Sequence, residues 1–92
     1  MRVVWTEPAL DGVARVYDYL YDFNPQAARQ VAANILDVDN GLVEFPARGR
    51  QVRHTAMREV MSAYPYIIRY RISGDEVVIL RVRHTARRPT SS

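Results

Sequence analysis

Two segments near the end of the chain, residues 66–72 and 77–84, alternate apolar side chains with arginine. An alternation with a period of two is typical of β-strands whose two faces meet different surroundings. The turn-forming residues 73–76 (SGDE) separate the segments, so the pattern predicts an antiparallel hairpin. A slip of one residue would bury arginine, and the apolar sets must therefore share one face.

This hairpin predicts where the arginines lie. Matching the two apolar sets requires a connection of odd length, because a two-residue Gly74-Asp75 connection would place Arg71 beside Val78. The expected result is a cationic face with these members: Arg69, Arg71, Arg81 and Arg83, with Arg87 and Arg88 just beyond. Guanidinium groups crowded on one side repel each other unless an anion or an acidic peptide lies near. The alternative interpretation is a sheet with one ordinary solvated face.

Two helices are predicted upstream of the strands. Thr6 is a suitable N-cap for a helix that ends near Asp22, and Asn24-Pro25 opens a second helix. The second helix should stop near residues 41–45, because the proline that follows cannot continue it. The short connection between them predicts an antiparallel helical hairpin.

The order of elements predicts the fold class. Further strands are expected at residues 2–5 and 56–62, and residues 47–55 are expected to form a basic loop. The order β-α-α-β-β-β indicates an α+β fold, with a helical hairpin packed on a small antiparallel sheet. Ninety-two residues suffice for one domain, expected over residues 1–89, with a frayed tail at residues 90–92.

Charge is divided unevenly along the chain. Residues 1–47 hold three arginines and seven acids, a balance of −4, whereas residues 48–92 hold ten arginines and three acids, a balance of +7. All 13 basic side chains other than histidine are arginine, whose planar fork of donors suits carboxylate or phosphate. The asymmetry points to an anionic partner for the second half.

Several classes of protein are disfavoured. The chain has no cysteine, which excludes disulfides, cysteine-ligated zinc and thiol catalysis. No apolar run approaches the ~18 residues of a membrane span, and no signal peptide is visible, so a cytoplasmic protein is expected. A glycine-rich phosphate loop, metal-ligand spacing and a Ser-His-Asp order are all missing. No cofactor and no metal are expected.

A family resemblance covers nearly the whole chain. It is carried, in this order, by VVWTEPAL, NPQAARQVAANI, FPARGRQV, TAMREV, YPYIIRYRI and GDEVVILRVRHTARRP. With these segments the chain resembles the RelE/ParE superfamily of toxins from bacterial type II toxin–antitoxin pairs. The resemblance implies one of two activities, since the RelE-like branch cuts messenger RNA on the ribosome and the ParE-like branch poisons DNA gyrase.

The resemblance also implies a partner. Toxins of both branches are neutralised by a cognate antitoxin whose C-terminal segment wraps the toxin. For a ParE-like chain this partner would be ParD-like, of the ribbon-helix-helix type, in a toxin–antitoxin hetero-oligomer. Candidates for the antitoxin groove are the apolar positions of the first helix: Leu10, Val13, Tyr17 and Tyr21. Binding by helix-in-groove docking or strand addition is expected; the alternative is that these residues form only core and rim.

The choice between branches depends on acid–base groups. RNA cleavage needs a base, an acid and cations for the phosphate. Arginine keeps its proton and cannot be the base, which leaves the tyrosines and three further candidates: His54, Glu59 and His84. Strand parity places His84 on the apolar side, as a structural residue, and His54 falls in a solvated loop.

The nuclease branch typically carries an arginine in the middle of its third strand and a tyrosine or histidine near its C-terminus. Here Ile67 falls at or beside the strand position, and the tail Arg87-Arg88-Pro89 has no tyrosine. The resemblance therefore implies a ParE-like toxin without catalytic residues that inhibits gyrase by binding. The alternatives are a RelE-like ribosome-dependent endoribonuclease and an inactive toxin-fold protein that only binds its antitoxin.

Overall fold

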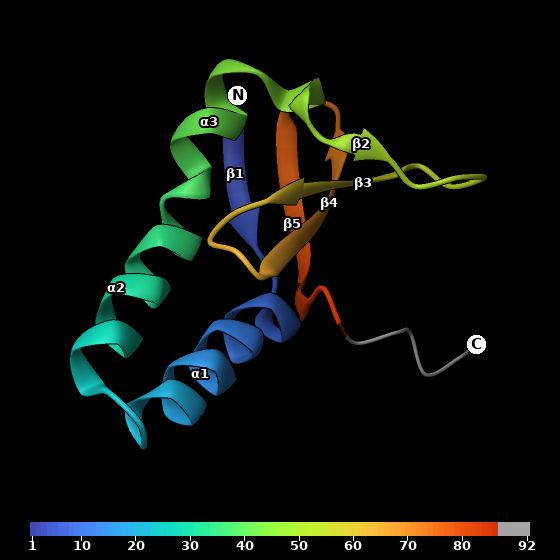
Figure 1. The fold of residues 1–92 in the computed structure, drawn as a ribbon. Helices are drawn as coiled ribbons and strands as arrows, with labels where there is room; N and C mark the ends of the chain where they lie inside the picture. The colour runs from blue at the N-terminus through green and yellow to red at the C-terminus, as the bar shows by residue number, and fades with distance from the viewer. Residues whose placement is uncertain (87–92) are drawn as a thin grey trace.

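The computed structural model describes residues 1–86, and every structural statement below concerns those residues. The elements in chain order are β1 (Arg2–Trp5), α1 (Glu7–Tyr21), α2 (Pro25–Leu36), α3 (Val38–Glu44), the 3-10 turn η1 (Pro46–Arg48), β2 (Arg50–Gln51), β3 (Met57–Met61), β4 (Tyr66–Ser73) and β5 (Glu76–His84). The helices lie on one side of the sheet, and its other side is open (Figure 1). The α+β class and the order β-α-α-β-β-β are confirmed.

The five strands form one sheet in the order β1-β5-β4-β3-β2. All neighbours are antiparallel except β1, which pairs parallel with β5; the sheet is therefore mixed. The parallel pairing places Thr6 beside Ile79, to whose carbonyl the Thr6 hydroxyl donates at 2.8 Å. Because Thr6 also caps α1, accepting from the Ala9 amide, β1 leads directly into the helix. The strand β2 lies within residues 47–55, for which the sequence predicts only a basic loop.

The β4–β5 connection differs from the prediction. It contains only Gly74 and Asp75, with Gly74 at a φ of 60°, so the expected odd length is wrong. Close to the turn, Arg71 does pair with Val78. Glycine supplies the positive φ of a tight two-residue connection without steric cost.

A β-bulge corrects the alternation in the middle of the hairpin. Tyr70 pairs with Ile79 and Arg69 pairs with Arg81, so that Leu80 is an extra residue on β5. One inserted residue reverses the alternation of everything beyond it. The bulge thus shifts the register by one residue, as a connection of odd length would have done. As a result, Arg81 and Arg83 on β5 lie on the same face of the sheet as Arg69 and Arg71 on β4.

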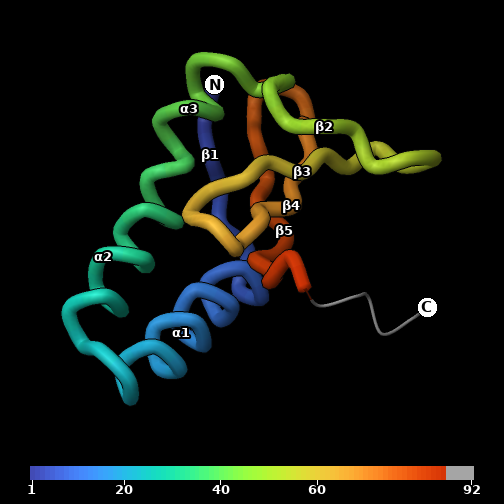
Figure 2. The backbone as a smooth tube through the Cα atoms, in the orientation of Figure 1, coloured from blue at the N-terminus to red at the C-terminus, as the bar shows by residue number. Residues whose placement is uncertain are grey.

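The core lies between the helices and the sheet. Its fully or nearly buried members come from both layers: Ala9, Val13, Ile35, Leu42, Tyr66, Ile68, Tyr70, Val77 and Ile79. Gly12 brings α1 close to β5, because a Cβ at this position would lie 3.1 Å from the Cβ of Val82. The tube in Figure 2 shows α1 running beneath the sheet, with α2 and α3 rising beside it.

The second helix begins as predicted but is divided. Asn24 caps it by accepting from the amides of residues 26 and 27 at 3.0 and 3.1 Å. The helix breaks at Asp37, between α2 and α3, so the single helix expected here is corrected to two. The break lets α3 follow the sheet to β1, where the Trp5 indole donates to Asp39 at 2.7 Å. Within residues 1–86 no helix has both the length and the apolar character needed to cross a bilayer.

Candidate functional site

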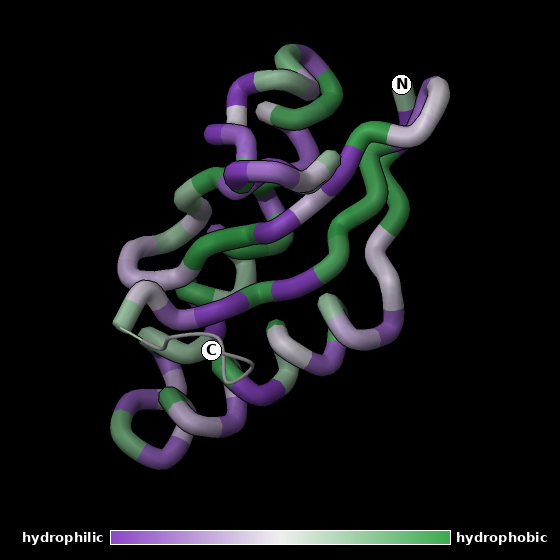
Figure 3. The backbone as a smooth tube through the Cα atoms, turned by 90° about the vertical axis from the view of Figure 1, so that its right-hand side faces the viewer, coloured by the Kyte–Doolittle hydropathy of each residue, from purple (hydrophilic) through white to green (hydrophobic). Residues whose placement is uncertain are grey.

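The open face of the sheet carries the arginines predicted from the alternation. Arg69 and Arg81 are cross-strand partners, Arg83 lies two residues beyond Arg81, and Arg71 lies two residues beyond Arg69. We call these four residues the basic face. Seen from that side, hydrophilic and hydrophobic positions alternate along the strands (Figure 3). The predicted Arg87 and Arg88 lie outside the described residues.

A buried carboxylate lies at the centre of the basic face. Glu59 on β3 is only 6% exposed, and its Oε2 accepts from Nη2 of Arg69 at 2.7 Å and from Nε of Arg83 at 3.2 Å. Arg50 on β2 places Nη2 3.6 Å from the other carboxylate oxygen. One acid therefore bridges four adjacent strands, and the protein supplies an anion that was expected to come from a partner.

The arginines also decide the ionisation of Glu59. Burial alone disfavours the charged carboxylate, but hydrogen bonds and charge from Arg83 and Arg69 outweigh it and lower the pKa of Glu59. A base for RNA cleavage would need the opposite shift, toward neutral pH. The arrangement therefore favours ionised Glu59, as a counter-ion for arginine, at neutral pH.

We expect this pKa shift to make folding acid-sensitive. Because the folded pKa of Glu59 is the lower one, its contribution is complete above the unfolded pKa of about 4.3 and is lost as pH falls through the folded value. Denaturation measured between pH 6 and pH 3 should show the free energy of unfolding falling less steeply in Glu59→Gln than in the wild type. The control Glu44→Gln, at an exposed position on α3, should keep the wild-type slope. An unchanged slope in Glu59→Gln would contradict the assignment.

The β2–β3 hairpin projects from the sheet edge beside the basic face (Figure 1). We call residues 50–57 the arm. Its base is locked by Tyr70, which is fully buried: the hydroxyl accepts from the Gly49 amide at 2.9 Å and donates to the Pro46 carbonyl at 2.6 Å. Arg58, the cross-strand partner of Tyr70, donates to the Gly49 carbonyl at 2.8 Å. A side chain at Gly49 would meet the Tyr70 hydroxyl at 2.6 Å, so this contact requires glycine.

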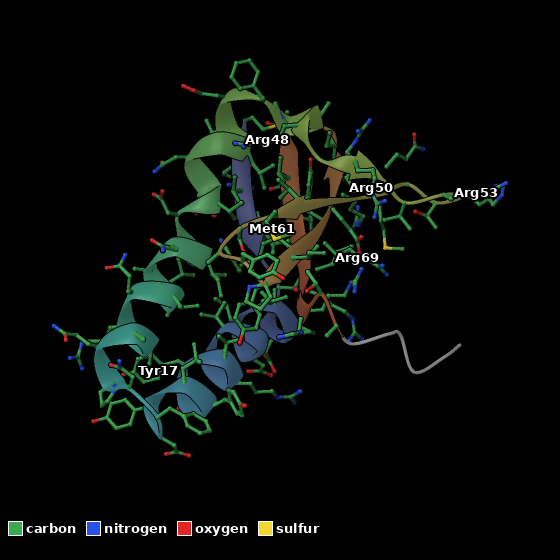
Figure 4. The ribbon with its side chains drawn as sticks, viewed as in Figure 1. Tyr17, Arg48, Arg50, Arg53, Met61 and Arg69 are labelled. Atoms are coloured by element: carbon green, nitrogen blue, oxygen red, sulfur yellow. The ribbon has the colours of Figure 1, made fainter. Side chains whose placement is uncertain are left out.

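The tip of the arm is an ordered turn. The amide of Thr55 donates to the Val52 carbonyl at 3.1 Å, and its hydroxyl donates to the same carbonyl at 2.8 Å. Arg53 and His54 occupy the centre of this turn and are exposed, with His54 at a φ of 62°. Figure 4 shows Arg53 at the far end of the arm, with Arg50 and Arg69 on the same side of the sheet.

The three nuclease candidates are not brought together. Glu59 is enclosed by arginines on the open face, and His54 lies at the tip of the arm. His84 pairs with Tyr66 on the helix-covered face, where their rings make an edge-to-face contact with centroids 5.4 Å apart. Its Nδ1 accepts from the Ala86 amide at 3.0 Å, which fits the predicted structural role. Among residues 1–86, no three His, Asp or Glu side chains are close enough to hold a metal ion.

The groove candidates on α1 divide between core and surface. Val13 is 8% exposed and packs against the sheet, so the expectation that it lines an open groove is not supported. Leu10 and Tyr21 are 48% and 46% exposed. Tyr17 is half-buried, and its ring centroid lies 5.7 Å from that of Tyr21. The helix turns Ala9 and Val13 inward, and Leu10, Tyr17 and Tyr21 form a partly exposed apolar strip along its flank.

Two comparisons concern sequence. The model of the ParE toxin of type II toxin–antitoxin systems matches residues 3–89. The toxin RelE2 of Caulobacter vibrioides is 40% identical over 86 residues, covering 94% of this chain and 97% of the relative. Both matches span nearly the full length of the chain.

Two further comparisons concern structure. The chromosomal ParDE toxin–antitoxin system from P. aeruginosa contains a chain with a TM-score of 0.81 at 24% identity, covering 91% of this chain and 95% of that one. The toxin–antitoxin complex RelBE2 from Mycobacterium tuberculosis gives a TM-score of 0.69 at 24% identity, covering 90% and 95%. At these identities the two structures establish a shared fold.

Proposed function

Because this chain belongs to the ParE toxin family of type II toxin–antitoxin systems, we propose that it inhibits DNA gyrase by binding, in the cytoplasm. The basic face is the proposed contact with the target. Arg71 and Arg81 are exposed there, and neither contacts a carboxylate of residues 1–86. They are thus available to acidic side chains or phosphates of a gyrase–DNA complex.

The observation that carries this proposal is the state of Glu59. It is the one carboxylate at the centre of the face, and hydrogen bonds from two arginines hold it as an anion. A cleavage site needs a base and an acid within reach of one substrate, whereas His54 and His84 lie away from Glu59. A surface of fixed cations without an acid–base pair suits binding.

We propose that a cognate antitoxin, of the ParD-like type, neutralises the chain and covers α1. The strip formed by Leu10, Tyr17 and Tyr21 leaves apolar and aromatic area exposed, which a partner helix can bury. This role is separate from the basic face, because the strip lies on the helical layer and the arginines lie on the opposite side of the sheet (Figure 4).

A supercoiling assay with purified gyrase tests the proposal. We expect the chain to block supercoiling and to accumulate cleaved plasmid, and we expect Arg81→Glu to weaken inhibition at least about tenfold, because reversing a target-facing charge replaces attraction with repulsion. The matched control is Arg15→Glu on the exposed surface of α1, which should inhibit like the wild type. Equal losses in the two variants would remove the basic face from the proposal.

The second candidate is a ribosome-dependent ribonuclease. It is favoured by the relative named RelE2, which is 40% identical to this chain. A translation extract separates the two functions. Cleavage of messenger RNA there, together with normal gyrase activity at the same toxin concentration, would overturn the proposal in favour of the ribonuclease.

A further inference from the structure

We propose that the arm and the basic face together bind the phosphate backbone of double-stranded DNA, with the arm entering a groove. The inference rests on the proposed function, since DNA held by gyrase would be the natural ligand, but it is argued from the arm. The arm forms no part of the core, yet it is anchored and ordered. Its base is held by Tyr70 and Arg58, and its tip is closed by Thr55.

The charges of this surface favour a polyanion. From residue 45 to residue 58 the chain has no acid. The arm contributes Arg50, whose side chain is 81% exposed, and Arg53 at the tip. With the four arginines of the basic face this makes six cations, and within residues 1–86 Glu59 is the one carboxylate bound among them. The net charge of this surface is therefore +5, as expected for a surface that contacts a phosphate backbone.

The shape and composition favour a duplex over a single strand. Single strands are bound by stacking their bases on aromatic side chains. The apolar positions that share the basic face in the described part of the chain are aliphatic: Val4, Met57, Met61, Ile67 and Val78. Among residues 1–86, no aromatic ring is placed between these arginines to stack a base. A two-stranded β-ribbon, in contrast, fits the major groove of DNA, and the arm is the projecting end of the short antiparallel ribbon formed by β2 and β3.

The experiment measures the anisotropy of a labelled DNA duplex of mixed sequence, about two helical turns long, titrated with the purified chain at several salt concentrations. Contact with four or five phosphates predicts a slope of log K against log salt of about −4. The double variant Arg50→Ala/Arg53→Ala should bind at least about tenfold more weakly at 0.1 M salt, with a slope shallower by about 2. This double variant and the control double variant described next are both checked for an unchanged unfolding transition.

The matched control is Arg15→Ala/Arg29→Ala, which removes two exposed arginines from α1 and α2. It should bind with the wild-type affinity and slope. The inference is overturned if the duplex is not bound, if both double variants lose affinity equally, or if an unlabelled single strand of the same length competes better than the unlabelled duplex.

The outcome is distinguishable from that of the gyrase assay. Duplex binding through the arm without gyrase inhibition would sustain this inference and remove the proposed target. Gyrase inhibition that is unchanged in Arg50→Ala/Arg53→Ala, together with absent duplex binding, would sustain the target and remove this inference.

Discussion

Replacing Tyr70 by phenylalanine is expected to lower the free energy of unfolding by about 2–4 kcal/mol. The ring would keep its place in the core, but the Gly49 amide and the Pro46 carbonyl would both lose their partner. Each unpaired buried backbone group costs about 1–3 kcal/mol, and the two groups sit together at the base of the arm. Urea denaturation measures the loss, and hydrogen exchange should show reduced protection of the Gly49 amide.

The matched control is Tyr66→Phe, the same chemical change on the same face of β4. Tyr66 is 8% exposed, and its hydroxyl has no hydrogen-bond partner among residues 1–86. Its removal should therefore cost well under about 1 kcal/mol. Similar losses in the two variants would mean that the Tyr70 hydroxyl does not lock the arm.

The parts of the fold that depend on local chemistry could be predicted from the sequence. The caps at Thr6 and Asn24 use side chains that bond amides two or three residues away. The strand alternation likewise reports which side chains share a face, and Arg69 and Arg81 do meet on one face. The family resemblance, carried by short segments in a fixed order, is confirmed by the match over residues 3–89.

The register could not be predicted, because two different devices restore the same alternation. A β4–β5 connection of odd length and a bulge at Leu80 would each bring the arginines to one face. The alternation of apolar residues and arginine in the sequence is the same in both cases. The contact between Tyr70 and Gly49 joins residues 21 positions apart and depends on the path of the intervening chain. The strand β2 is only two residues long, too short for any periodic pattern.

The role of Glu59 could be predicted in part from the sequence. The second half of the chain has three acids, and two of them, Asp75 and Glu76, lie at the hairpin turn. Glu59 is thus the one acid within a predicted strand. Its alternation with Met57 and Met61 placed it on a defined face, but which arginines meet it depends on the pairing of β3 with β4.

Replacing Glu59 by alanine is the second change with a large expected effect, a loss of about 2–3 kcal/mol in the free energy of unfolding. The carboxylate is 6% exposed, and the Arg69 and Arg83 side chains are 22% and 26% exposed. Removal of a buried partner leaves cations that are partly shielded from water, and Arg69 then faces Arg81 across the strands. Because the arginines retain some exposure, the loss should fall below that of a fully buried pair.

Two measurements separate this electrostatic cause from loss of packing. Arg69→Ala should cost less in the Glu59→Ala background than in the wild type, and a double-mutant cycle should give a coupling of at least about 0.5 kcal/mol. Sulfate at matched ionic strength should also stabilise Glu59→Ala more than the wild type, because an anion can enter the vacated position between the guanidinium groups. The alternative outcome is that the Glu59→Ala and Arg69→Ala losses are additive and that sulfate stabilises Glu59→Ala and the wild type equally. That outcome would show that Glu59 contributes through its volume and not as the counter-ion that positions the arginines.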